Sequence, residues 1–181
     1  MNRIDRLAVA AVLGLGSLFV VARAGGDEPG HSARPNFVLL LADDMGWMDS
    51  TPYGSRYYET PQMERLAEQS MRFTDAYAMP LCTNTRIQLM TGKYNLRNWK
   101  AFGILDPQAD TFAHMLQRAG YKTCIAGKWQ LTLLKRNPQH AAQLGFDQSA
   151  LFGWHEGPRY HAPMIYRNGV VWEEKQKPDV Y

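Results

Sequence analysis

The pattern of apolar residues along this 181-residue chain predicts alternating strands and helices. Residues 36–42 form a continuous apolar run, which has the length and pattern of a strand buried on both faces of a parallel sheet. Residues 121–126 repeat that pattern, and segments with apolar residues at helical spacing lie between the two runs. This alternation is typical of an α/β layered fold, so we predict a mostly parallel sheet flanked by helices.

Three segments between these runs carry helix signals. Thr60 and Pro61 supply an N-cap and a proline at the first helical position. Residues 85–91 predict a short helix that starts just after Cys82. Asp110 is predicted to cap a third helix. The buried face of that helix is expected to comprise Phe112, Met115, Leu116 and Ala119.

Two further segments predict strands. Residues 71–77 alternate between apolar and polar side chains, as a strand with one buried face does. Residues 164–173 predict a β-hairpin, because Asn168 and Gly169 form the dipeptide that favours a tight two-residue turn.

The first residues carry export signals. Residues 1–6 are basic, residues 7–21 are apolar, and residues 22–24 (ARA) form a small-x-small cleavage site. The apolar run is shorter than the roughly 20 residues that span a bilayer, so a retained anchor is the weaker alternative. We therefore expect export to the periplasm or the cell exterior, without a stable membrane anchor. The expected division is a signal peptide at 1–24, a linker at 25–34 and a catalytic portion at 35–181.

Charge and cysteine content exclude some classes of protein. The net charge of +3 is small and lies partly in the signal peptide, so it indicates no nucleic-acid or membrane partner. Cys82 and Cys124 are too few for a disulfide framework. We expect both to be free, because one opens a helix and the other lies inside an apolar strand.

Three short blocks carry candidate chemistry. Asp43 and Asp44 follow the first apolar run, at the sheet edge where α/β folds place ligands, and their carboxylates suit a hard divalent cation. The alternative is a turn cap and a solvated side chain. Cys82 opens a helix, where the positive end of the dipole stabilises anions, and Arg86 follows one turn later. A buried structural cysteine beside a surface arginine is equally compatible with that pattern.

The third block lies at the end of the second apolar run. Lys128 can bind an anionic substrate as a point charge, although an ordinary solvated lysine has the same signature. Trp129 beside it is expected to pack rather than to recognise a ligand. Residues 154–161 are aromatic and basic, which favours either the lining of a sugar pocket or a plain surface loop.

In this order and spacing the blocks resemble the sulfatase family, which has the alkaline phosphatase superfamily fold. The similarity extends over essentially the whole chain after residue 33. The segments that carry it are residues 34–46 (RPNFVLLLADDMG), 60–61 (TP), 72–77 (RFTDAY), 81–86 (LCTNTR), 89–94 (LMTGKY), 120–129 (GYKTCIAGKW) and 145–147 (GFD).

The resemblance implies an arylsulfatase-like sulfuric ester hydrolase. In that family the cysteine of the motif is oxidised to formylglycine, whose hydrate attacks sulfur while a divalent cation, usually Ca²⁺, polarises the sulfate oxygens. Carried over to this chain, the metal ligands are Asp43, Asp44 and Cys82; the catalytic residues are Cys82, Arg86 and Lys128; and the substrate-binding residues are Lys128 and Gln130. The implied partners are a sulfated small molecule or carbohydrate and a formylglycine-generating enzyme.

The sequence departs from the family pattern at three points. Asn84 stands where the motif has proline, and Gln130 stands where many members have histidine. Glutamine donates hydrogen bonds but cannot shuttle a proton near neutral pH. No Asp followed by Asn or His comes after Lys128, so we expect only the first part of the family's catalytic domain here. An inactive remnant that binds a sulfated glycan without cleaving it is the alternative.

Overall fold

The computed structural model of this chain describes residues 34–157 and 163–172. The predicted signal peptide and nearly all of the predicted linker lie outside these residues. The described chain divides into an extended unit, residues 34–41, and a folded unit that begins at Ala42. Within these described ranges, no helix has the length and apolarity that crossing a membrane requires.

The folded unit combines helices with a sheet in which α4 connects the parallel strands β1 and β2, which confirms the α/β fold class. The helices are η1 (Trp47–Asp49), η2 (Thr51–Tyr53), α1 (Pro61–Glu68), α2 (Cys82–Thr91), η3 (Asn95–Arg97), α3 (Phe112–Arg118) and α4 (His140–Gln143), where η marks a 3-10 helix. The strands are β1 (Cys124–Lys128), β2 (Gln148–Phe152), β3 (Ile165–Arg167) and β4 (Val170–Trp172).

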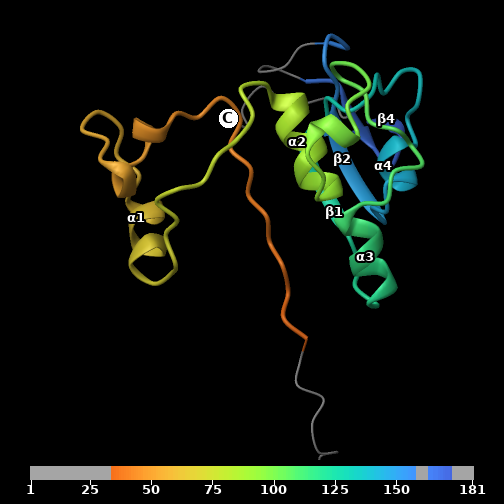
Figure 1. The fold of residues 1–181 in the computed structure, drawn as a ribbon. Coiled ribbons are helices and arrows are strands. Elements are labelled where there is room, and N and C mark those ends of the chain that lie inside the picture. The colour runs from red at the N-terminus through yellow and green to blue at the C-terminus, as the bar shows by residue number, and fades with distance from the viewer. Residues whose placement is uncertain (1–33, 158–162, 173–181) are drawn as a thin grey trace, which may run out of the picture. The chain divides into compact units, whose positions relative to one another are not determined.

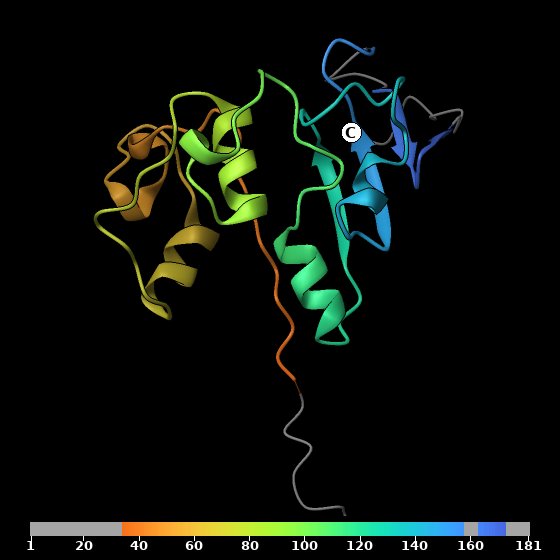
Figure 2. The ribbon, with the colours of Figure 1, turned by 45° about the vertical axis from the view of Figure 1, so that its right-hand side comes forward.

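The four strands form one mixed sheet in the order β1-β2-β3-β4. Figure 1 and Figure 2 show β1 and β2 side by side, and they run parallel, with Lys128 opposite Phe152. The pairs β2–β3 and β3–β4 are antiparallel, so the described sheet has one parallel pair and two antiparallel pairs. The predicted hairpin is confirmed as β3–β4. Asn168 and Gly169 form its turn with φ of 50° and 82°, the left-handed values that a type I′ turn requires.

The hydrophobic core lies around the segment that follows β1. Trp129, Leu131 and Leu134 are at most 1% exposed, and helices α2 and α3 contribute Ile87 and Ala113 to the same cluster. Burial of these side chains is the main favourable term that holds α2 against the end of β1. The buried apolar side chains are Ile87, Met90, Leu105, Ala113, Trp129, Leu131, Leu134, Ala141, Leu144, Phe146, Leu151 and Tyr166.

The predicted helices are present with some shifted ends. Helix α1 begins at Pro61 as expected, but the Thr60 hydroxyl bonds Thr51 instead of capping the helix. Helix α2 begins at Cys82 itself rather than three residues later.

The predicted N-cap of helix α3, Asp110, is wrong. Its N-cap is Thr111, whose hydroxyl accepts from the backbone N–H of His114 and donates to the carbonyl of Leu144. The Asp110 carboxylate instead pairs with Arg118 on the surface. The predicted buried face is also partly wrong, because Met115 is 57% exposed.

Two of the predicted strands are wrong. Residues 36–42 and 71–77 have no strand structure, and Val38 and Tyr77 are 83% and 91% exposed. A buried strand needs hydrogen-bonding neighbours that are remote in sequence, and an apolar run alone does not supply them. Neither segment is paired with a strand within the described residues.

The strand predicted at residues 121–126 is present but begins at Cys124. Its start is displaced because the backbone N–H of Thr123 donates to Asp147 and its hydroxyl donates to the carbonyl of Gly145. Cys124 is exposed, and within the described sheet β1 pairs on one side only, with β2. The expectation of burial on both faces is therefore wrong.

Candidate functional site

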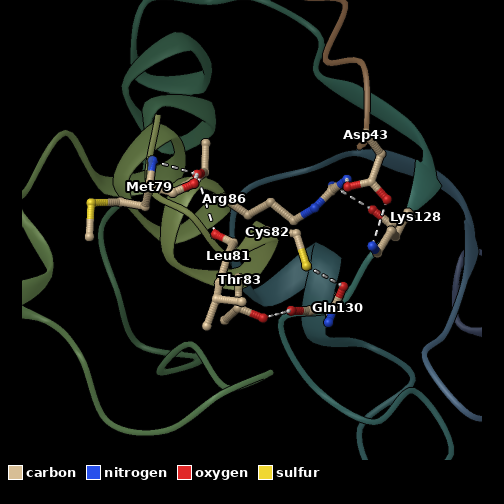
Figure 3. A network of polar contacts seen from close by, with 9 residues as sticks. Asp43, Met79, Leu81, Cys82, Thr83, Arg86, Lys128 and Gln130 are labelled. Carbon is tan, nitrogen blue, oxygen red and sulfur yellow. Dashed lines mark hydrogen bonds and ion pairs between the residues drawn. The ribbon is translucent and has the colours of Figure 1, made fainter. Parts of the chain in front are cut away.

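The candidate site forms where helix α2 begins and strand β1 ends. Cys82 is the first residue of α2, and Arg86 follows one helical turn later on the same face. Lys128 is the last residue of β1, and Gln130 follows two positions on. Figure 3 shows that the side chains of Arg86 and Lys128 point toward Asp43, while the sulfur of Cys82 points toward Gln130.

Two cationic side chains converge on one carboxylate. Lys128 Nζ lies 2.6 Å from Asp43 Oδ2, and Arg86 Nη2 lies 3.3 Å from Asp43 Oδ1. The second terminal nitrogen of Arg86, Nη1, donates to the backbone carbonyl of Lys128 at 2.8 Å. The side chains of Arg86 and Lys128 are only 11% and 14% exposed, so both positive charges are largely withdrawn from water. The arrangement therefore stabilises a negatively charged group at this point.

This network sets the protonation of Asp43. Partial burial opposes ionisation of the carboxyl, but the hydrogen bond and charge of Lys128, together with Arg86, outweigh that effect. As a result the pKa of Asp43 lies below its ordinary value. The carboxylate is thus ionised at neutral pH and balances part of the positive charge of the site.

The candidate nucleophile is held by Gln130. The Cys82 thiol donates to Gln130 Oε1 with a Sγ–O distance of 3.0 Å. Gln130 is 2% exposed and has a positive φ of 40°, a conformation uncommon for a residue with a side chain. Thr83 fixes this backbone, because its hydroxyl donates to the carbonyl of Gln130 and accepts from the N–H of Gly103. Gln130, which accepts the hydrogen bond of Cys82, is therefore held in place through Thr83.

A buried pair of rings lies behind Lys128 and Gln130. The indole N–H of Trp129 donates to Nδ1 of His140 at 3.1 Å, so the imidazole proton lies on Nε2, which donates to the carbonyl of Leu105. Burial lowers the pKa of His140, because the charged form is disfavoured away from water, although the bond to Leu105 opposes this. A neutral His140 thus fixes Trp129 between two residues of the site, and the prediction that Trp129 packs rather than recognises a ligand is confirmed.

A cavity of about 230 Å³ lies next to the site and includes Gln130 in its lining. Its other lining residues are Phe102, Gly103, Ile104, Thr132, Leu133, Arg136 and Trp154. The aromatic segment that was predicted to line a sugar pocket or a surface loop therefore contributes Trp154 to a cavity wall. His161, from the same segment, lies outside the described residues.

The remaining predicted residues are not joined to this network. Asp44 is exposed with a φ of 55°, and Cys124 is a free, exposed cysteine at the start of β1, the opposite end of the strand from Lys128. Asn84 lies within α2, where its backbone carbonyl accepts from Asn95. Asp147 serves the loop before β2 by accepting from Thr123.

The described residues do not by themselves form a calcium site. Both oxygens of Asp43 are already bonded to Lys128 and Arg86, and Ca²⁺ takes about six to eight oxygen ligands. Among residues 34–157 and 163–172, no three His, Cys, Asp or Glu side chains come together as a metal-binding group. The three predicted metal ligands therefore do not fit the cation as they stand here.

Three buried polar residues of this region were not predicted from the sequence. Thr83, His140 and Glu156 are at most 4% exposed, and each bonds a segment that carries or adjoins the site. Each looks like an ordinary helix or loop residue in the sequence, and its partners lie 11 or more positions away. Only tertiary structure reveals such contacts.

Comparison with known proteins identifies one family over most of the chain. The family model described as Sulfatase matches residues 35–173. N-acetylgalactosamine-6-sulfatase of Canis lupus familiaris is 35% identical over 170 residues, which cover 84% of this chain and 31% of that protein. Arylsulfatase H of Homo sapiens is 39% identical over 118 residues, which cover 57% of this chain and 21% of that protein. The chain thus spans under a third of the length of these curated relatives.

Solved structures agree with this comparison. The crystal structure of Ps i-CgsB matches with a TM-score of 0.57 and 31% sequence identity, over 62% of this chain and 27% of that one. The same protein in complex with k-i-k-neocarrahexaose matches with a TM-score of 0.57 and 30% identity, over 62% of this chain and 26% of that one.

Proposed function

This chain belongs to the sulfatase family, and we propose that its site serves the hydrolysis of a sulfate ester on a carbohydrate. The observation that carries the proposal is the convergence of Lys128 and Arg86 on one anionic group, next to the Cys82–Gln130 pair. A sulfate ester is an anion whose bond to the alcohol oxygen must break, so its hydrolysis needs cationic donors and a nucleophile close together.

Each residue of the site has a proposed role. Arg86 offers a planar fork of N–H donors, and Lys128 offers a compact charge, so the two together hold and polarise sulfate oxygens. Gln130 orients the side chain at position 82 through its Oε1. His140 does not touch the substrate in this scheme, but its bond to Trp129 fixes the backbone between Lys128 and Gln130.

Position 82 fits the modification that the family resemblance implies. It is half-buried at a helix start, unpaired with Cys124, and within hydrogen-bonding distance of a fixed acceptor. When present, a formylglycine supplies a hydrated aldehyde as nucleophile, and a formylglycine-generating enzyme is then a required partner. The calcium ion stays a prediction, and no step is assigned to it because the described residues do not complete its ligand set.

Two relatives support a carbohydrate as the alcohol part of the substrate. Ps i-CgsB has been solved in complex with k-i-k-neocarrahexaose, and another relative is named for sulfate on N-acetylgalactosamine. Export to the periplasm or the cell exterior, predicted from residues 1–24, is consistent with a glycan substrate.

The test is sulfate release from galactose 6-sulfate and from 4-nitrocatechol sulfate. The chain is produced together with a formylglycine-generating enzyme, and the mass of the peptide around Cys82 reports its conversion. We expect release by the parent protein, none by Cys82→Ala, and unchanged release by Cys124→Ala, since Cys124 is exposed and outside the site.

Two outcomes count against the proposal. Release that survives in Cys82→Ala would place the chemistry elsewhere. Efficient conversion of Cys82 without any sulfate release would favour the alternative, a remnant that binds sulfated glycan without cleaving it.

A further inference from the structure

The cavity and the candidate nucleophile share one neighbouring residue, Gln130. Gln130 lines the cavity and also accepts the hydrogen bond of the Cys82 thiol. We propose that this cavity binds the sugar ring that carries the sulfate ester, and that Arg136 recognises a second anionic group on that ring. The inference rests on the proposed function, and it adds the substrate class: a sulfated sugar that also bears a carboxylate or a further sulfate.

The size and walls of the cavity suit one ring. Its volume of about 230 Å³ lies below the roughly 300–1,000 Å³ of pockets for drug-sized ligands. Trp154 forms an aromatic wall, and Phe102 fixes its orientation through an edge-on contact with ring centroids 5.0 Å apart. Ile104 and Leu133 are apolar residues of the lining, whereas Gln130 and Thr132 are polar ones. A mainly apolar and aromatic lining with a few oriented polar groups is typical of sites for small organic ligands.

Arg136 supplies the charge at the exposed side of this cavity. Arg136 is an exposed residue of the cavity lining, and its backbone N–H donates to the carbonyl of Leu133. Across the described ranges no carboxylate forms an ion pair with Arg136, unlike Arg86 and Arg118. A planar guanidinium binds carboxylate or sulfate through two parallel N–H donors, so a second anionic substituent is the group that it fits.

Buried polar side chains hold the cavity walls in place. The Thr83 hydroxyl ties two lining residues, Gly103 and Gln130, to the helix that carries Cys82. On the other side, the Glu156 carboxylate is 4% exposed and accepts from the backbone N–H groups of Leu134 and Lys135 at 2.9 and 2.6 Å.

Gly153 makes room for that carboxylate. A Cβ at this position would lie 1.7 Å from Glu156 Oε2. The segment that carries Arg136 is thereby fixed beside Trp154 before any ligand arrives, and such preorganisation lowers the cost of binding.

The experiment measures binding of two unsulfated probes to the 181-residue chain by calorimetry. Methyl galacturonoside carries a carboxylate, whereas methyl galactoside is neutral. We expect the galacturonoside to bind about tenfold more tightly, the size of one charge-assisted contact. Arg136→Gln should remove this preference, and the matched control Lys135→Gln should keep it, because the Lys135 side chain does not line the cavity.

A second variant tests the placement of the ring. Trp154→Leu should weaken the binding of both glycosides by about tenfold, since it removes the aromatic wall from both complexes. A circular dichroism melt of each variant verifies that it is folded.

Three results would overturn the proposal: equal affinity for the two probes in the parent protein, equal losses in Arg136→Gln and Lys135→Gln, or unchanged affinities in a folded Trp154→Leu. Neither probe carries sulfate, and the readout is binding alone. Failure to release sulfate would therefore count against the proposed function and leave the ring site standing, whereas these three results count against the ring site alone.

Discussion

The described residues before Cys82 and those from Cys82 to residue 157 contain similar apolar side chains but bury them differently. In residues 34–81 Ser50 is the only buried side chain, and Leu40 is 85% exposed. In the later region Leu131 and Leu134 are fully buried. The two regions differ in strand pairing. Strand β1 pairs with β2, whereas the apolar run at residues 36–42 pairs with no strand within the described residues.

The same contrast runs through the candidate site. Cys82, Lys128 and Gln130 come from the packed region, where core side chains and buried hydrogen bonds hold their backbones. Asp43 comes from the exposed region and is attached to the site by its ion pairs with Lys128 and Arg86. We expect the candidate nucleophile Cys82 and the candidate sulfate-binding residue Lys128 to be fixed more firmly than the Asp43 carboxylate.

The largest effect should come from a matched pair of leucine substitutions. Leu131→Ala should lower the free energy of unfolding by about 2–5 kcal/mol, because it leaves a cavity in the core. Leu40→Ala should change it by less than about 0.5 kcal/mol, because that side chain is already exposed. Urea denaturation followed by circular dichroism measures both, and equal effects would contradict the comparison.

Removal of one buried hydroxyl should have the next largest effect. Thr83→Val leaves the N–H of Gly103 and the carbonyl of Gln130 without their partner, which should cost about 1–3 kcal/mol of unfolding free energy. Thr83→Ser keeps the hydroxyl and should recover most of that loss. If the valine variant were as stable as the serine variant, the two hydrogen bonds of the Thr83 hydroxyl would not stabilise the fold as we describe.

Acid should weaken the packed region through His140. The pKa of His140 in the folded chain is lowered by burial, so the unfolded chain binds the proton more readily. The stabilisation that comes from neutral His140 should be fully present above the unfolded-state pKa of about 6.5. The free energy of unfolding should fall as the pH drops below that value, by up to about 1.4 kcal/mol per pH unit.

Two measurements check the assignment to His140. Urea denaturation of His140→Gln should show little pH dependence between about pH 6.5 and pH 5, above the range where carboxylates titrate. An NMR titration of His140 in the parent chain should give a pKa below 6.5. A value above 6.5 would contradict the account even if the variant did not fold.

The smallest effect should come from the carboxylate of the exposed region. Arg86 and Lys128 are largely withdrawn from water, but the Asp43 carboxylate is 32% exposed, so solvent screens the two ion pairs from its side. Asp43→Asn removes both pairs and should lower the unfolding free energy by about 0.2–1 kcal/mol at low salt. Salt at about 1 M should reduce that difference. The control is Asp75→Asn, since Asp75 accepts a hydrogen bond from Thr74 and forms no ion pair within the described residues. A loss as large as that of Leu131→Ala would show that Asp43 is part of the core.

Local signals in the sequence predicted the parts of the fold that depend on neighbouring residues. Pro61 marks the start of α1, and Asn168 with Gly169 sets the β3–β4 turn, because backbone geometry at these positions is fixed by residue type. The strand predicted from the apolar run at residues 36–42 is wrong, because strand formation depends on distant partners that a local pattern does not contain. The motif blocks offered Cys82 and Lys128 as candidate site residues, and their chemical roles stay predictions.

The hydrogen bonds and ion pairs that hold the candidate site together could not be predicted from the sequence. His140 bonds Trp129 from a helix 11 positions later, and Glu156 reaches back to Leu134 across 22 positions. The two links from Asp43 to Arg86 and Lys128 likewise span 43 and 85 positions. Such pairs are chosen by the fold, so the sequence offered the site residues without showing which of them would meet.

The most direct test of this account is sulfate release by Lys128→Met compared with Lys122→Met, each with Cys82 converted. Both substitutions remove a lysine charge near β1, but only Lys128 lies beside Arg86 and Asp43. We predict that Lys128→Met lowers the rate about 10²–10³-fold, the usual effect of losing one donor to the developing charge, and that Lys122→Met retains the parent rate. Equal rates in the two variants would contradict the claim that the end of β1 is the sulfate site.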